Sequence, residues 1–177
     1  PGQGTPYPAF TNEGTTQPKF DGRVDYDFPD HTRSMSFSGG FSGTTGIMHS
    51  GIGPFSIDQG TTMSYGKFNF TQNALHVQAF MNVLNGDATS LLTVRPDGSQ
   101  IPFHFDSKTF DIEGGNSLVT GTKNVLTYGG NVRMNRFDLQ IAPGEDSRNE
   151  GGAYVQDEFA ANKYFRVVAG ARVDKFT

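Results

Sequence analysis

Alternation of apolar and polar side chains constrains this chain more than any other feature. It is clearest over residues 75–83, and the apolar members there are Leu75, Val77, Ala79, Met81 and Val83. His76, Gln78 and Asn82 lie between them. Because successive side chains of a β-strand point to opposite faces of the sheet, this period predicts a strand with one apolar face.

Similar segments recur along the whole chain. The predicted strands cover residues 20–28, 34–42, 61–70, 75–83, 105–118, 126–134, 152–159 and 165–176, with a register slip near Ser107. No window of about 11 residues carries the apolar spacing of a helix. The predicted fold is therefore all-β: an antiparallel up-and-down meander of about eight strands, part of a larger transmembrane β-barrel.

The connections between these segments alternate in length. Short links rich in turn-forming residues fall at 29–33, 71–74, 120–124 and 160–163, and long links fall at 45–60, 85–104 and 139–149. Short turns at one end and long loops at the other are typical of outer-membrane barrels. A strand of about ten residues, tilted by about 45°, also spans roughly the 25 Å apolar band of such a barrel.

Composition and charge exclude several classes of protein. The longest apolar run, near 167–171, is far shorter than the ~20 residues of a spanning helix. The net charge is −4 with no basic stripe, so nucleic acid is not an expected partner. The chain has no Cys for thiolate chemistry and no nucleophile elbow, P-loop or dinucleotide fingerprint. We therefore predict no catalytic residue, no cofactor and no metal site.

The C-terminal third carries an ordered set of short motifs. They are LTYGGN at 126–131, GGAYVQDEF at 151–159 and FRVVAGARVDKF at 165–176. In this order they resemble the mid-barrel region of TonB-dependent receptors, where a YGGN strand, a YVQDE strand and a GxRxD strand follow one another. The match is close over these motifs, and strand and loop lengths extend it loosely over the rest of the chain.

The resemblance implies a 22-stranded barrel of the bacterial outer membrane, closed by an N-terminal plug. Its implied activity is uptake of a scarce ligand such as a siderophore, cobalamin or an oligosaccharide. Its implied partners are outer-membrane lipid, that ligand at the outer loops, and the TonB complex through the plug. Residues 1–177 would form a partial barrel domain, with the plug and the remaining strands lying outside this sequence.

Ligand contacts are expected on the long loops. The candidate residues are His49, Asp97, His104, Glu145, Asp146 and Arg148. His49 and His104 are the two of the four histidines placed on long loops, and no two of the histidines have a metal-ligand spacing of two or four residues. The alternative to ligand contact, for all six residues, is that they are solvent-exposed loop residues that bind nothing.

Charged side chains also occur on the polar faces of the predicted strands. They include Asp21, Asp25, Arg133, Arg166, Arg172 and Asp174. In a barrel they would project inward, so we interpret them as a charge network that stabilises the wall or contacts a plug.

Two other architectures remain open at this stage. A secreted or surface β-sandwich that binds carbohydrate or protein would bury Val77, Met81 and Val167 against a second sheet. A small closed eight-stranded barrel would pair 20–28 with 165–176. A slice of a larger barrel would instead be an open sheet with both of these edges unpaired.

Overall fold

The computed structural model describes residues 14–51, 53–58, 60–140, 144 and 146–177, and in these residues every regular element is a β-strand. The strands are β1 (Lys19–Asp27), β2 (Arg33–Gly43), β3 (Gly46–Ser50), β4 (Gly53–Ile57), β5 (Thr62–Gln72), β6 (Leu75–Val94), β7 (Gln100–Thr120), β8 (Asn124–Leu139), β9 (Ser147–Ala160) and β10 (Arg166–Phe176). The all-β prediction is confirmed. The described residues contain no helix long and apolar enough to cross a membrane.

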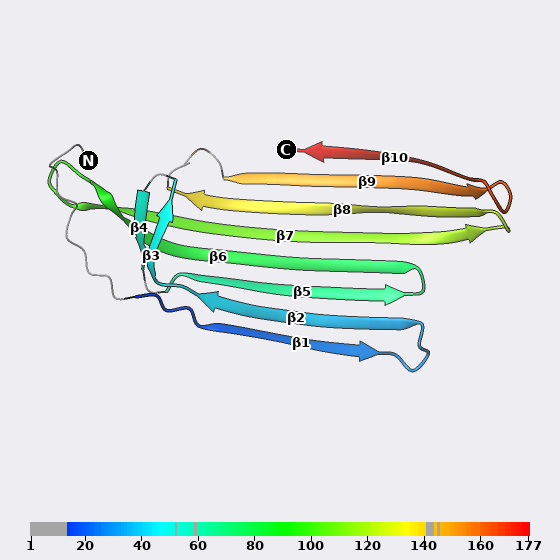
Figure 1. The fold of residues 1–177 in the computed structure, drawn as a ribbon, viewed down its shortest axis with the longest axis horizontal. Helices are drawn as coiled ribbons and strands as arrows, with labels where there is room; N and C mark the ends of the chain where they lie inside the picture. The colour runs from blue at the N-terminus through cyan, green and yellow to red at the C-terminus, as the bar shows by residue number, and fades with distance from the viewer. Residues whose placement is uncertain (1–13, 52, 59, 141–143, 145) are drawn as a thin grey trace.

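The strands form one antiparallel up-and-down sheet (Figure 1). Its order is β1-β2-β5-β6-β7-β8-β9-β10, and these are the eight strands that the alternation predicts. The short turns gather at one end of the sheet and the longer connections at the other (Figure 1). At the short-turn end, Asn73 has a φ of 52°, which Asn tolerates better than most residues, and its backbone N–H donates to the carbonyl of Thr32 at 2.9 Å.

The structure adds two strands that the sequence analysis did not predict. The β3–β4 hairpin lies within the long link 45–60, and β4 pairs with β6 through Ile57 opposite Ala88. The link 85–104 is also largely strand, because β6 and β7 continue to a turn in which Arg95 and Ser99 pair. The expected register slip near Ser107 is wrong, since pairing is continuous there and the shift lies between Thr89 and Val94.

The two faces of the sheet differ in chemistry. One row on the apolar face runs from β1 to β8 through Val24, Phe37, Phe68, Ala79, Ile112 and Val132. One row on the polar face crosses all eight strands through Asp25, Ser36, Asn69, Gln78, Glu113, Asn131, Gly152 and Asp174. The period of two thus separates the side chains as the alternation predicts.

The apolar face has no second layer over it in the described residues. Met81 is 51% exposed and Val167 58% exposed, Ala169 and Ala171 are exposed, and Val77 and Ala79 are half-buried. The described residues therefore form a single sheet, unlike a sandwich. The buried apolar residues Ile57, Ala88 and Leu91 all belong to β4 and β6 at the loop end.

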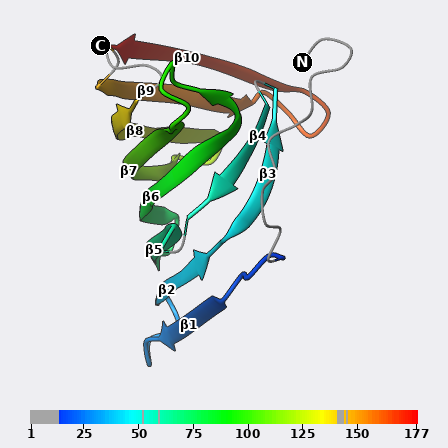
Figure 2. The same ribbon diagram turned by 90° about the vertical axis from the view of Figure 1, so that its left-hand side faces the viewer.

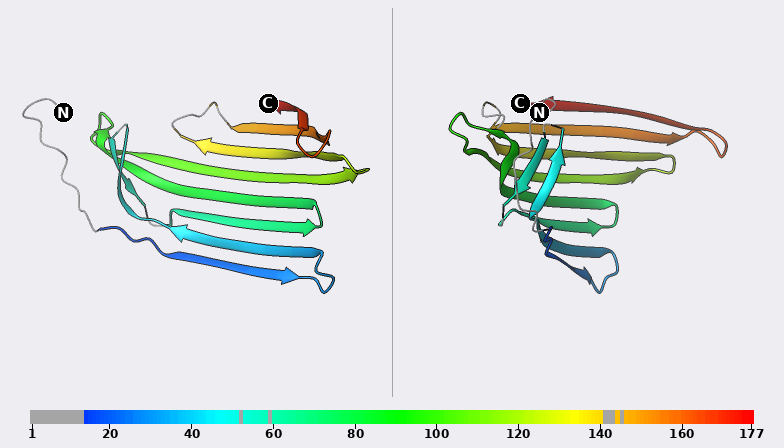
Figure 3. Two further views of the ribbon diagram at one scale, coloured as in Figure 1. Left: turned by 45° about the vertical axis from the view of Figure 1, so that its right-hand side comes forward. Right: turned by 60° about the vertical axis from the view of Figure 1, so that its left-hand side comes forward.

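The sheet is open. β1 pairs only with β2, and β10 pairs only with β9, so no ladder joins 20–28 to 165–176. Figure 2, which looks along the strands from the loop end, shows β1 and β10 at opposite edges of a curved sheet, and both views in Figure 3 agree. The expectation of an open, curved sheet is confirmed, and the described residues do not form the closed eight-stranded barrel.

Candidate functional site

The polar face carries the expected charge network. Its most buried member is Asp111, 3% exposed, whose Oδ2 accepts a hydrogen bond from Nε of Arg133 at 2.8 Å. Other contacts join Arg172 to Asp174 at 2.6 Å, Arg166 to Glu158 at 3.0 Å and Arg23 to Asp25 at 2.6 Å. The hydroxyl of Tyr65 also donates to Asp21. These contacts tie neighbouring side chains of the face to one another.

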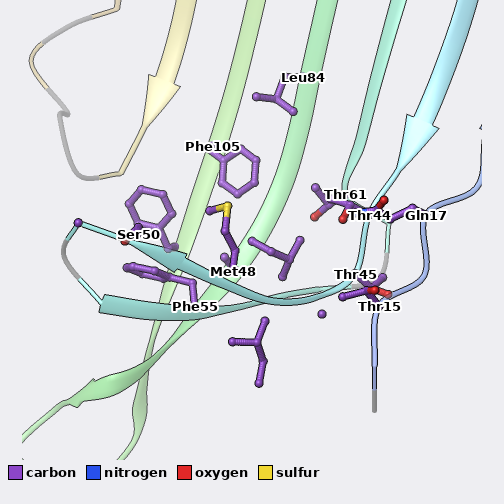
Figure 4. A pocket seen from close by; sticks show the side chains of 16 residues that line it. Thr15, Gln17, Thr44, Thr45, Met48, Ser50, Phe55, Thr61, Leu84 and Phe105 are labelled. Carbon is purple, nitrogen blue, oxygen red and sulfur yellow. The ribbon is translucent and has the colours of Figure 1, made fainter. Parts of the chain in front are cut away.

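A cavity of 670 Å³ lies on the polar-face side of the sheet at its loop end. Its apolar wall is made by Met48, Phe55 and Ile57 of the hairpin, Leu84 and Ala88 of β6, and Phe103 and Phe105 of β7. Its polar wall is made by Thr15, Gln17, Thr44, Thr45 and Thr61. Figure 4 shows these Thr and Gln side chains together on one side, with the Phe and Met side chains on the other.

Strand pairing explains why these apolar residues converge. Ile57 pairs with Ala88, Ala88 with Phe103, and Phe55 with Ser90, so the hairpin presents its side chains to the same face as β6 and β7. The ring centroids of Phe55 and Phe103 are 5.7 Å apart, and those of Phe103 and Phe105 are 6.1 Å apart. These are the spacings of packed aromatic pairs, so the three rings form a continuous aromatic wall.

Two glycines permit this geometry. Gly46 begins the hairpin with a φ of 117°, which residues with a Cβ rarely adopt. Gly86 lies beneath the ring of Phe105, and a Cβ there would be 2.7 Å from that ring and 2.6 Å from Cγ2 of Thr61. Any larger residue at position 86 would therefore require Phe105 or Thr61, both of which line the cavity, to move.

The residues expected to contact ligand lie outside this cavity. His49 is an exposed residue of β3, and Nδ1 of His104 lies 2.8 Å from Oδ1 of Asp87. That hydrogen bond is the main reason why the pKa of His104 is raised from its ordinary value. Asp97 accepts hydrogen bonds from the N–H and hydroxyl of Ser99, which lower the pKa of its carboxyl group.

The remaining candidates are on or near β9. Asp146 accepts a hydrogen bond from the hydroxyl of Ser147 at 2.9 Å, and Nε of Arg148 lies 2.9 Å from Oε1 of Glu150. The guanidinium of Arg148 also covers the ring of Phe176 at 5.5 Å. Glu145 lies outside the described residues. Of the six candidates, the five that are described thus occupy separate places and do not converge on one site.

The cavity was not predicted from the sequence, because the residues that line it are separated by segments typical of loops. Phe55 and Ile57 are two residues apart, but Met48 is separated from them by a segment with Gly51, Gly53 and Pro54, which are typical of a loop. The signal that could have found the hairpin is a pair of apolar residues on each side of that Gly-rich turn, Ile47 and Met48 before it and Phe55 and Ile57 after it. Within the described ranges, no group of three or more His, Asp or Glu side chains could hold a metal ion.

An open antiparallel sheet with one apolar face, one polar face, short turns at one end and long connections at the other defines the wall of a β-barrel. Solved structures agree. The FrpB iron transporter from Neisseria meningitidis, F5-1 variant in its apoprotein form, matches with a TM-score of 0.63 over 93% of this chain, at 14% sequence identity. The F3-3 variant matches with a TM-score of 0.62 over 92% of this chain, also at 14% identity.

The likeness is one of fold. The chain spans about 30% of the length of these two structures. No protein-family model and no curated protein sequence matches the chain.

Proposed function

We propose that this chain is a segment of a TonB-dependent receptor barrel in the bacterial outer membrane. The receptor would actively take up a scarce ligand such as a siderophore, cobalamin or an oligosaccharide. Its partners would be outer-membrane lipid, the ligand at the loop end, and the TonB complex through a plug domain. No catalytic step is assigned to the chain.

The exposed apolar face is the observation that carries the proposal. Soluble monomers rarely expose apolar patches beyond a few hundred Å². Here the large apolar residues exposed on this face include Val24, Phe37, Met81, Phe110 and Val132. Toward the loop end, the apolar region stops at two charged residues, Lys108 of β7 and Arg136 of β8, which lie opposite each other in neighbouring strands. An apolar band bounded in this way suits contact with lipid.

The membrane part of the proposal is tested by two adjacent substitutions in β6. Val77 lies on the apolar face, where it pairs with Gly114, midway between Phe110 and Leu118. Gln78 lies on the polar face, and both residues are half-buried. Arginine on the lipid face near the bilayer midplane costs about 2–4 kcal/mol, whereas arginine toward a lumen costs little. Val77→Arg in the full-length protein should therefore lower its resistance to urea in lipid vesicles, and Gln78→Arg should not. Equal effects of the two substitutions would contradict the proposal.

The transport part needs a different experiment. Cells that produce the full-length protein should accumulate a radiolabelled ligand from a panel of siderophores, cobalamin and oligosaccharides. Accumulation should stop when TonB is deleted and return when TonB is supplied again. Uptake that persists without TonB would point to passive diffusion through the barrel and would overturn active transport.

A further inference from the structure

We infer that the cavity beneath the β3–β4 hairpin binds the uncharged part of an organic ligand that has an apolar ring at one end and neutral hydrogen-bonding groups at the other. The inference rests on the proposed function, because it assigns the substrate class of the receptor's outer mouth.

The size of the cavity suits a small organic molecule. At 670 Å³ it falls within the range of about 300–1,000 Å³ that is typical of ligand sites. Its walls come from separate parts of the chain, namely the segment before β1, the hairpin, β6 and β7. A molecule in the cavity would therefore contact several elements at once.

The cavity is divided into two chemical halves. Phe55 and Phe105 line the apolar half, and Met48 adds a flexible apolar side chain beside them. Phe103 also lines the cavity, and its ring packs against those of Phe55 and Phe105. Aromatic side chains prefer stacked or edge-on contact with another ring. Thr15, Gln17 and Thr45 lie in the other half, where hydroxyl and amide groups can both donate and accept hydrogen bonds.

The lining carries no ionisable side chain in the part of the chain that the structure describes. A charged group moved into such surroundings would lose its hydration without gaining a partner of opposite charge. A bare metal ion would lack carboxylate, imidazole or thiolate ligands. The cavity therefore favours a neutral portion of the ligand, although FrpB, a structural neighbour, is described as an iron transporter.

Cysteine labelling tests this chemistry directly. The chain has no Cys, so an introduced thiol is the only one within it. Met48→Cys places a thiol in the cavity, and His49→Cys places one on the adjacent residue outside its lining. Ser50→Cys is a second cavity position in case Met48→Cys fails to fold. The full-length protein, with any cysteine outside this chain replaced, would be studied in lipid nanodiscs.

Two probes of opposite character are compared, neutral N-phenylmaleimide and a maleimide that bears a carboxylate. The ratio of their labelling rates should be at least about tenfold higher at position 48 than at position 49, because the cavity accepts the ring and excludes the charge. Phe103→Ala should reduce this preference, whereas Phe110→Ala, on the opposite face of β7, should leave it unchanged. Equal ratios at the two positions would overturn the inference.

A separate arm tests the proposed function. A maleimide linked to a polyethylene glycol too large to cross the outer membrane should label Asp97→Cys at the loop end of intact cells. It should not label Asn162→Cys at the short-turn end. If Asp97→Cys is labelled only in broken cells while the preference at position 48 holds, the receptor orientation fails and the ligand class stands. If Asp97→Cys is labelled in intact cells but the labelling preference at position 48 is absent, the receptor orientation stands and the ligand class fails.

Discussion

The side chain of Tyr154 on β9 lies over Gly129 on β8, its direct partner in the sheet. A Cβ at Gly129 would be 2.7 Å from the Tyr154 hydroxyl, and a Cβ at the next glycine in the row, Gly115, would be 2.8 Å from the same oxygen. His76 on β6 approaches Gly115 from the other side. Two glycines thus form a recess in which one aromatic side chain crosses the polar face.

Filling that recess should destabilise the wall. Gly129→Ala brings the new Cβ within 2.5 Å of the Gly114 carbonyl oxygen, which is backbone and cannot easily move. We expect a loss of about 1–3 kcal/mol, as for other overpacked sites. Gly66→Ala is the matched control, because a Cβ there meets nothing within 4 Å. Urea unfolding of the full-length protein in lipid vesicles measures both, and equal stabilities would contradict the packing.

The ion pair of Asp111 and Arg133 should respond asymmetrically to substitution. Asp111 is buried, whereas the side chain of Arg133 is 41% exposed. Arg133→Met leaves a buried carboxylate without its partner, which typically costs about 3–5 kcal/mol. Asp111→Asn leaves a cation with access to water and should cost clearly less. A double-mutant cycle on unfolding free energies checks this, and the double variant should recover most of the loss from Arg133→Met.

His104 should titrate above its ordinary value of 6.5, because Asp87 stabilises the protonated ring. A raised folded-state pKa means that this contribution is fully present below pH 6.5 and is lost as pH rises through the folded-state pKa. Asp87→Asn should lower the His104 titration midpoint measured by NMR. Asp97→Asn, a change in the β6–β7 turn, should leave it in place. If Asp87→Asn does not change the titration midpoint, the hydrogen bond from Asp87 is not what raises the pKa of His104.

Hydrogen exchange should distinguish edge strands from central ones. In the isolated 177-residue chain held in detergent, the outward amides of β1 and β10 should exchange faster than those of β6, because they have no partner strand. In the receptor barrel that we propose, those edges should be protected. In water the isolated chain should aggregate through its open edges. Strong protection of β1 and β10 in a monomeric isolated chain would mean that the two edges meet.

The sequence predicts the eight strands of the wall much better than the β3–β4 hairpin and the cavity at the loop end. Alternation such as that from Leu75 to Val83 follows directly from the two faces of a strand, so all eight wall strands could be located. The hairpin at 46–57 could not, because its turn residues break the period and its stability depends on pairing with β6, which is distant in sequence. Single-residue candidates such as His49 remain predictions, since side-chain type alone does not indicate which residues a fold brings together.

The order of the strands in this sheet allows the wall to be assembled one hairpin at a time. In the main path, each strand joins its neighbour in the chain, apart from the excursion of β3 and β4 between β2 and β5. Contacts are therefore local, and each new hairpin can form on the edge left by the one before it. The growing edge advances along the chain as synthesis does. A wall built this way can be lengthened or shortened by whole hairpins without rearranging the strands already in place.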